Sequence, residues 1–346
     1  MAALQRVGLF CMATYYGFHV TFRLIKLMFT IGPKAVLGKK EHPKPKVLSD
    51  PALGSHGILH LDEVRIHCVS SGPEDKPLML FLHGFPEFWY SWRHQIREFQ
   101  KDYRVVAIDQ RGYGDSDKPS GIDSYVISKL TSDVSQVIAS LGYKSCVLVA
   151  HDWGGAVAWA FARRFPDMVD KLIVMNSPPS PVMQKLFQES KEQRKMSWYM
   201  FLFQLPWLPE LFIRSCDYAF LDRVFGNPVP APTDMISPPF PTEVSKSDVE
   251  AYKHVFSQPG TTNATINWYR AALQRGRYSY TMDYTMPVLL IWGLKDIALS
   301  HTVPDIAQAM NPKIAVKRVP EAGHFVQMEA PEVVNSTMRD WLSKQE

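Results

Sequence analysis

An aspartate occupies the position at which the sequence predicts a nucleophile. Asp152 follows the apolar run Cys146 to Ala150 and precedes Trp153-Gly154-Gly155, so we expect a strand, a tight turn and a helix start in succession. A nucleophile elbow has this form, and the small residues Ala150 and Gly154 would permit its sharp turn. The alternative is that Asp152 only caps the helix that follows.

The identity of this residue selects the chemistry. A serine that attacked a saturated carbon would leave a stable ether, whereas a carboxylate leaves an ester that water can hydrolyse. Asp152 therefore implies displacement at an sp³ carbon, followed by hydrolysis of the ester. A serine esterase is excluded, because no serine occupies the elbow.

A histidine and a second aspartate follow later in the chain, each after a strand-like run. Asp296 comes after the apolar run Val288 to Trp292, and His324 comes after the last strand-like run. Nucleophile, acid and histidine follow one another in this order in α/β-hydrolases. We therefore expect His324 to activate water as the base and Asp296 to orient it. Taken singly, a loop histidine or aspartate is usually a surface residue.

Two backbone N–H groups are expected to bind the oxyanion of the tetrahedral intermediate. His83-Gly84-Phe85-Pro86 directly follows an apolar strand, the place from which such folds supply one donor. We assign the oxyanion hole to the backbone of Phe85 and Trp153. Alternatively, His83-Gly84 is only a tight turn.

Short apolar runs alternate with helical patterns and predict an α/β fold with a mostly parallel sheet and helices on both faces. Two earlier β-patterned runs, Gly57 to Leu61 and Val64 to Val69, predict an antiparallel entry to this sheet. The runs expected to form the parallel strands are Leu78 to Leu82, Tyr103 to Ile108, Cys146 to Ala150, Leu172 to Met175, Val288 to Trp292 and Ile314 to Val319.

The pattern divides the chain into four parts. We expect a membrane-associated helix at residues 1–33, a linker rich in lysine and proline at 34–51, and the α/β-hydrolase core at 52–176 and 287–346. Residues 177–286 are rich in aromatic residues, methionine and proline, which predicts an inserted helical cap. Such a cap would close a pocket over the carboxyl ends of the strands.

The composition is that of a globular enzyme. Hydrophobic residues make up 46% of 346 residues, and the net charge of +4 does not indicate a nucleic-acid partner. The four cysteines are far apart and fit neither a zinc site nor a dense disulfide framework.

The N-terminal segment Val7 to Ile31 is predominantly apolar, and only His19, Arg23 and Lys26 could carry a positive charge. It could span a membrane if Arg23 and Lys26 reach the interface. Alternatively, His19, Arg23, Lys26 and Thr30 share one face of a basic amphipathic helix that lies in the membrane surface. A cleaved signal peptide is the third alternative, although no clear cleavage site follows.

A group of lysines follows this segment, and only Arg6 and the amino terminus precede it. The positive-inside rule then predicts a cytosolic catalytic domain, and we expect it at the membrane of the endoplasmic reticulum. The lysines are Lys34, Lys39, Lys40, Lys44 and Lys46.

The leaving group distinguishes two reactions that use an aspartate nucleophile. Epoxide opening leaves an alkoxide that needs a proton donor, a role that suits tyrosine. Tyr199 and Tyr269 of the expected cap are candidates, although either alone could be a packing aromatic residue. In a haloalkane dehalogenase, Trp153 would instead donate to a halide.

Five motifs of the chain occur together in one known family. They are His83-Gly84-Phe85-Pro86-Glu87, Asp109-Gln110-Arg111-Gly112-Tyr113-Gly114-Asp115-Ser116, His151-Asp152-Trp153-Gly154-Gly155, Phe256-Ser257-Gln258-Pro259-Gly260 and Asn267-Trp268-Tyr269-Arg270. With them, from about residue 52 to its end, the chain resembles the epoxide hydrolases of the α/β-hydrolase fold. With its apolar N-terminus it is most similar to the membrane-anchored animal epoxide hydrolase 3 and 4 group. Two positions depart from the family pattern, since Ala150 replaces a frequent glycine and Gln110 an apolar residue.

The resemblance implies that Asp152 is the nucleophile, His324 the base and Asp296 the orienting acid. It also implies that Tyr199 and Tyr269 donate to the epoxide oxygen, and that the diol forms without a metal or organic cofactor. A membrane helix beside an apolar pocket suggests lipophilic substrates, with fatty-acid epoxides as the natural candidates.

Two alternatives to an epoxide hydrolase remain from the sequence. Dehalogenases usually carry an asparagine after His-Gly, where this chain has Phe85, which lacks a side-chain donor. A catalytically silent, membrane-bound lipid-binding protein on the same fold is the other alternative, because a fold does not fix function. The intact set of Asp152, Asp296 and His324 argues against it.

Overall fold

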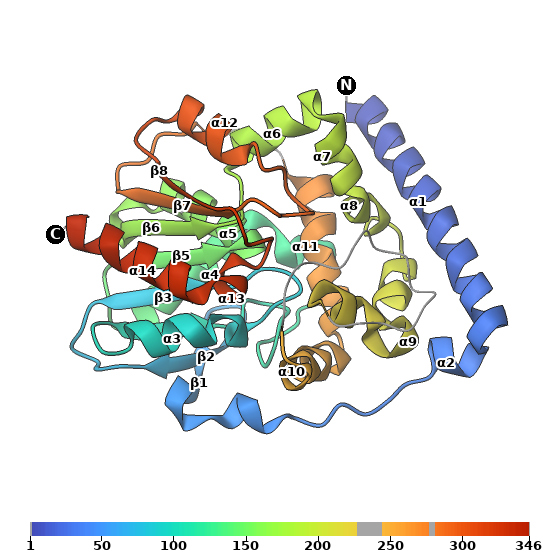
Figure 1. Ribbon diagram of the computed structural model, residues 1–346, viewed down its shortest axis with the longest axis horizontal. Helices are drawn as coiled ribbons and strands as arrows, with labels where there is room; N and C mark the ends of the chain where they lie inside the picture. The colour runs from blue at the N-terminus through green and yellow to red at the C-terminus, as the bar shows by residue number, and fades with distance from the viewer. Residues whose placement is uncertain (1, 227–243, 277–280, 346) are drawn as a thin grey trace.

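The computed structural model describes residues 2–226, 244–276 and 281–345, and side chains from residue 7 onward. Its centre is an eight-stranded sheet with the order β1-β2-β4-β3-β5-β6-β7-β8 (Figure 1). Strand β2 is antiparallel to β1 and β4, and every other neighbouring pair is parallel. The strands are β1 (Ser55–His60), β2 (Arg65–Ser71), β3 (Leu78–Leu82), β4 (Arg104–Ile108), β5 (Cys146–His151), β6 (Val169–Met175), β7 (Val288–Gly293) and β8 (Ala315–Val319).

Each of the eight runs predicted from the sequence overlaps one of these strands, and four of them extend one residue beyond it. The mostly parallel sheet is confirmed. Strands β3 and β5 are buried along their whole length, which is why they appear as unbroken apolar runs. Strand β6 begins three residues earlier than expected, at Val169. A β-bulge beside Cys146 lets Val169 pair with that residue and extends the strand.

Helices cover both faces of the sheet (Figure 1). Helices α3 and α14 pack together on one face, and α4 and α5 pack together on the other. The helices of this part of the chain are α3 (Arg93–Phe99), α4 (Ile127–Ser140), α5 (Asp152–Arg164), α12 (Val303–Met310), α13 (Val326–Glu329) and α14 (Pro331–Leu342).

The segment between β6 and β7 is helical where it is described. It lies at the edge of the sheet where β5, β6 and β7 end, so it faces the elbow that follows β5 (Figure 1). Its helices are α6 (Ser180–Glu189), α7 (Lys191–Met196), α8 (Trp198–Leu202), α9 (Leu208–Val224), α10 (Lys246–Ser257) and α11 (Thr261–Arg275).

Helix α1 (Ala2–Ile31) runs along the outside of α8 and α9 (Figure 1). Ala13, Val20, Leu24 and Leu27 are buried on its inner face. A spanning helix was one expectation for this segment. Among the described residues, however, no helix is long and apolar enough to cross a membrane.

The segment that the sequence assigned to a linker, residues 34–51, is mostly exposed but is held to the rest of the molecule by buried side chains. It contains α2 (Pro33–Leu37) and two short 3₁₀ helices, Lys46–Ser49 and Pro51–Leu53. Val36, Leu48 and Leu53 are buried, so this segment connects α1 to β1 along the surface of the molecule rather than as a free tether.

Phe81 in the centre of β3 tests the packing of the sheet. It is fully buried and its ring lies 5.0 Å from that of Trp92. We expect Phe81→Ala to lower the free energy of unfolding by about 3 to 5 kcal/mol, because it leaves a cavity in the core. Ile58→Ala on the exposed edge strand β1 should cost less than about 1 kcal/mol in the same urea titration. Equal losses would contradict this description of the core.

Candidate active site

The turn between β5 and α5 places Asp152 above the carboxyl end of the sheet. Its φ angle is +47°, a strained value for a non-glycine residue. The elbow fits closely against its neighbours, since a Cβ on Gly154 would lie 2.2 Å from the Leu82 carbonyl oxygen. A Cβ on Gly84 would lie 2.4 Å from the Cβ of Asp152. Small residues are therefore required on both sides of the Asp152 side chain.

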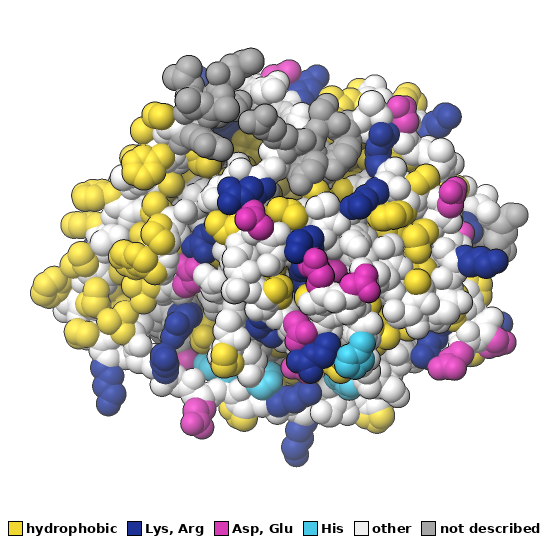
Figure 2. Space-filling view, turned by 180° about the vertical axis from the view of Figure 1, so that it is seen from behind, with side chains coloured by type: hydrophobic (Ala, Val, Ile, Leu, Met, Phe, Trp, Pro, Cys, Tyr) yellow, Lys and Arg dark blue, Asp and Glu magenta, His cyan; other side chains and the backbone are white. Residues whose placement is uncertain are grey.

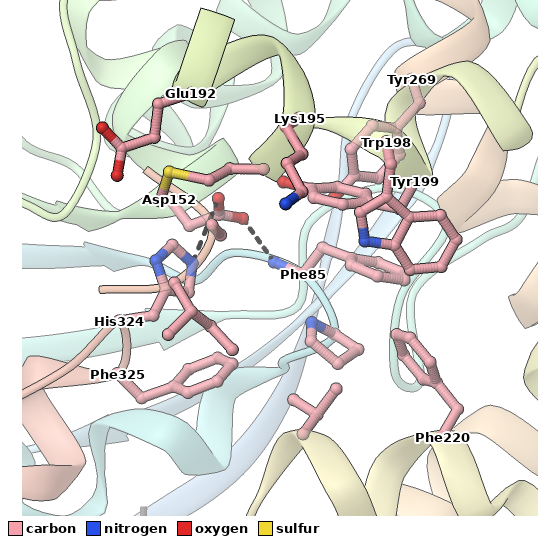
Figure 3. A pocket seen from close by; sticks show the side chains of 15 residues that line it. Phe85, Asp152, Glu192, Lys195, Trp198, Tyr199, Phe220, Tyr269, His324 and Phe325 are labelled. Atoms are coloured by element: carbon pink, nitrogen blue, oxygen red, sulfur yellow. Dashed lines mark hydrogen bonds and ion pairs between the residues drawn. The ribbon is translucent and has the colours of Figure 1, made fainter. Parts of the chain in front are cut away.

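The structure brings His324 to this carboxylate (Figure 3), and Asp296 lies against the other nitrogen of the His324 ring. His324 Nε2 lies 3.5 Å from Asp152 Oδ2, and its Nδ1 donates to Asp296 Oδ2 over 2.7 Å. Asp296 follows β7, and His324 follows β8. The three side chains thus come from the ends of three strands and form one chain of polar contacts.

Asp296 is fixed by hydrogen bonds to both of its oxygens. Oδ1 accepts from the backbone N–H groups of Ala298 and Leu299. Oδ2 accepts from the Asn176 amide over 2.7 Å as well as from His324. The sequence analysis assigned no role to Asn176, although its signal was visible as a polar residue directly after a buried parallel strand.

One of the two expected oxyanion donors already binds the carboxylate. The Phe85 N–H donates to Asp152 Oδ1 over 2.8 Å. In the described part of the chain, the Trp153 N–H makes no such bond to Asp152. It lies in the first turn of α5, where N–H groups have no acceptor within the helix, so it can bind a developing oxyanion.

A second acid and histidine lie behind the site, and the sequence analysis assigned them no role. Glu87 accepts from His151 Nδ1 over 2.6 Å and from the Gly84 N–H over 2.7 Å. His151 Nε2 donates to the His324 carbonyl oxygen over 2.8 Å. This buried pair holds the backbone of His324 and the loop that carries Phe85. Only their places in shared motifs pointed to them in the sequence.

The pKa values of Asp152 and His324 move apart. Burial raises the pKa of Asp152, but the hydrogen bond and charge of His324 outweigh it and leave that pKa below its usual value. Burial lowers the pKa of His324, but the adjacent carboxylates of Asp296 and Asp152 raise it well above its usual value. The resting site therefore holds an ionised carboxylate beside a protonated imidazole.

Tyr199 of α8 and Tyr269 of α11 line the same cavity, with ring centroids 5.8 Å apart. Burial raises the pKa of both phenols, and the negative charge of Asp152 raises it further. Both tyrosines therefore keep their protons at ordinary pH. Neutral phenols opposite a carboxylate can protonate an oxygen that leaves a carbon under attack.

The cavity has a volume of about 280 Å³ and is mainly apolar. Figure 3 shows Asp152 and His324 on one side and Trp198, Tyr199 and Phe220 on the other. In residues 2–226, 244–276 and 281–345, no three side chains of His, Cys, Asp or Glu gather so that they could hold a metal ion.

Comparisons with known proteins identify the family of this fold. A family model described as the alpha/beta hydrolase fold matches residues 77–331. Epoxide hydrolase 1 of Caenorhabditis elegans is 39% identical, with 95% of this chain and 80% of that protein covered. Epoxide hydrolase 4 of Homo sapiens is 38% identical, with 96% and 91% covered.

A solved structure is similar as well. An epoxide hydrolase from Bacillus megaterium, in complex with an inhibitor, shares 35% identity and a TM-score of 0.72. The similarity covers 83% of this chain and all of that one.

Titration of His324 tests the electrostatics of the site. In Asp152→Asn one of two carboxylates is removed, so the pKa of His324 should fall and its proton should leave at lower pH. The titration can be followed by NMR of protein labelled with ¹⁵N at histidine. Asp170→Asn, at an exposed position of β6, is the control and should leave the midpoint unchanged. An unchanged midpoint in Asp152→Asn would show that the two side chains are not coupled.

Proposed function

Because the chain belongs to the epoxide hydrolases of the α/β-hydrolase fold, we propose that it converts lipophilic epoxides to vicinal diols through an ester on Asp152. The observation that carries this mechanism is the placement of Asp152 at the elbow, with His324 on one side and two neutral tyrosines across the cavity.

In the first half-reaction, Asp152 Oδ2 attacks one carbon of the epoxide ring. Oδ1 is held by the Phe85 N–H, so it becomes the carbonyl oxygen of the ester. The ring C–O bond breaks as the ester bond forms. Tyr199 and Tyr269 bind the ring oxygen, and one of them transfers its proton to the alkoxide. The product is a hydroxyalkyl ester beside a tyrosinate.

Formation of the ester changes His324. The ester is neutral, so His324 loses one of the two carboxylate charges that raise its pKa. The proton of His324 then passes to the tyrosinate, and the neutral imidazole can act as a base. The negative charge of Asp152 thus prevents His324 from acting before the substrate is bound covalently.

In the second half-reaction, His324 takes a proton from water, and the hydroxide attacks Cγ of the ester. The oxyanion forms on Oδ1, between the N–H groups of Phe85 and Trp153. Collapse of the intermediate breaks the ester bond, and the new carboxyl group gives its proton to the leaving alkoxide. The diol departs, and Asp152 and the protonated His324 are restored.

The lining of the cavity supports lipophilic substrates, and fatty-acid epoxides are the class we propose. Met196, Trp198, Phe220 and Phe325 line the cavity with apolar surface. A dehalogenase is disfavoured, because the ring of Phe85 packs against aromatic residues and offers no donor to a halide.

We also propose that α1 lies in the surface of a membrane. Its outer face exposes large apolar side chains, seen in Figure 2 along the left edge. His19, Arg23 and Lys26 form an exposed polar strip beside that face. An apolar face flanked by basic residues is typical of interfacial helices. The apolar residues are Val7, Phe10, Phe18, Phe22, Ile25 and Phe29.

The same proposal places the catalytic domain at the cytosolic face of the endoplasmic reticulum. The lysines that follow α1 support it, because anionic lipids of a cytosolic leaflet attract basic residues near the membrane. Two of them, Lys39 and Lys40, are exposed just after α2.

Trapping of the ester tests the catalytic proposal. In His324→Gln the first half-reaction persists and the second stops, so incubation with a fatty-acid epoxide should add the mass of the epoxide to the peptide that contains Asp152. Asp152→Asn should add no mass and should lower the turnover number by at least about 10⁴-fold. A panel of haloalkanes assayed in parallel tests the alternative that the protein is a haloalkane dehalogenase. Halide release without diol would identify a dehalogenase, and no reaction with either class would favour a lipid-binding protein.

Vesicle binding tests the membrane proposal. We expect Phe18→Ser, Phe22→Ser and Phe29→Ser together to lower partitioning into vesicles of phosphatidylcholine and phosphatidylserine by more than about tenfold, since each removes apolar area. Ile58→Ser on β1 is the matched control, and flotation is the measurement. Turnover of a water-soluble epoxide should persist in the triple variant. Undiminished flotation of that variant would refute a docking role for α1.

A further inference from the structure

Helix α1 meets the cap through a narrow contact at Gly17. A Cβ on Gly17 would lie 2.4 Å from Leu205 Cδ1 and 3.5 Å from Leu208 Cδ2, so the backbone of α1 approaches these side chains directly. Gly8 of the same helix has nothing within 4 Å of the corresponding point. Of these two glycines, only Gly17 lies directly against the cap.

The next contact of α1 is with the helix that carries Tyr199. The ring of Tyr16 lies 6.1 Å from that of Trp198 and 6.3 Å from that of Phe201, measured between centroids. Trp198 and Phe201 flank Tyr199 in α8, and Trp198 and Tyr199 both line the catalytic cavity. Tyr16 thus packs on the outside of the wall whose inner side carries a proposed proton donor.

The turn that follows α8 joins this wall to the second tyrosine. The Arg270 guanidinium donates to the carbonyl oxygens of Phe203, over 3.0 Å, and Leu205, over 2.6 Å. The Gln204 side chain donates to the Tyr269 carbonyl oxygen over 3.3 Å. Leu205 therefore contacts α1 with its side chain and α11 with its carbonyl oxygen.

Aromatic packing completes the link inside the cavity. The ring of Phe203 lies 5.8 Å from that of Tyr199 and 4.9 Å from that of Tyr269, in edge-to-face geometry. A displacement of the turn at Phe203 to Leu205 would move both phenols relative to Asp152. Among the described residues, His324 and Asp296, which serve ester hydrolysis, make none of these contacts. Phe85 meets Phe203 and Tyr269 through its ring, with centroids 5.7 and 5.3 Å apart, and serves the oxyanion through its backbone N–H.

We propose that α1 is a positioning element of the active site, which seats α8 and the turn after it so that Tyr199 and Tyr269 face the ring oxygen of the epoxide. This inference rests on the proposed function, since it concerns the two proton donors. It assigns Tyr16 and Gly17, which lie outside the catalytic cavity, to the ring-opening step alone. Attachment to a membrane and ring opening then share one helix.

Gly17→Leu in the full-length protein in detergent tests the proposal, with Gly8→Leu as a matched control. Single-turnover mixing with a water-soluble aryl epoxide gives two rates, one for formation of the Asp152 ester and one for its hydrolysis. We expect Gly17→Leu to slow ester formation on the order of 10- to 100-fold, as a displaced reacting group would. Ester hydrolysis should keep its rate within about twofold, and Gly8→Leu should change neither.

A second substitution separates positioning from a general loss of structure. Leu205→Ala removes the side chain that Gly17→Leu would strike, so the double variant should regain most of the rate of ester formation. If Gly17→Leu does not fold, Tyr16→Ala provides the same test, because it removes the ring that packs on α8. Tyr15→Ala, at an exposed position, is its control.

The outcomes are distinct. Equal slowing of both steps, or unchanged ester formation in Gly17→Leu and Tyr16→Ala, would overturn the positioning role of α1. If wild-type protein forms no ester on Asp152, the proposed function itself is wrong, and the positioning role falls with it.

Discussion

An ionised carboxylate in a mostly apolar cavity must be surrounded by positive charge and N–H donors, and the site around Asp152 meets this requirement. The Phe85 N–H binds one oxygen, and His324 lies beside the other. Asp296 in turn needs four donors of its own, which come from two backbone groups, Asn176 and His324. Each charge in the site is balanced by a partner from a different strand, so the sheet must form before the site can exist.

The same electrostatic arrangement orders the two half-reactions in time. While Asp152 is ionised, two carboxylates keep His324 protonated, and a protonated imidazole cannot activate water. Once the ester forms, one of those charges is gone. The proposed mechanism therefore needs no moving part to separate alkylation from hydrolysis, because neutralisation of Asp152 by the substrate is itself the signal.

Much of the fold and site could be predicted because the decisive features are local in sequence. Buried parallel strands appear as apolar runs, and an elbow appears as an aspartate between small residues. Asn176 and Glu87 escaped assignment because their partners, Asp296 and His151, lie 120 and 64 residues away. The contact of α1 with the turn after α8 could not be predicted for the same reason. Gly17 looks like any helical glycine until Leu205 lies against it.

The nucleophile and the two phenols belong to different parts of the molecule. Asp152 sits on the rigid sheet, whereas Tyr199 and Tyr269 come from helices α8 and α11, inserted between β6 and β7. In the proposed mechanism, the epoxide lies between these two parts, with Asp152 Oδ2 on one side of it and the two phenols on the other. A small shift of the inserted helices relative to the sheet would change which of the two epoxide carbons lies in line for attack by Asp152. The stereochemistry and regiochemistry of the diol are thereby set by how the cap sits on the sheet, and the catalytic residues themselves can stay the same while selectivity diverges.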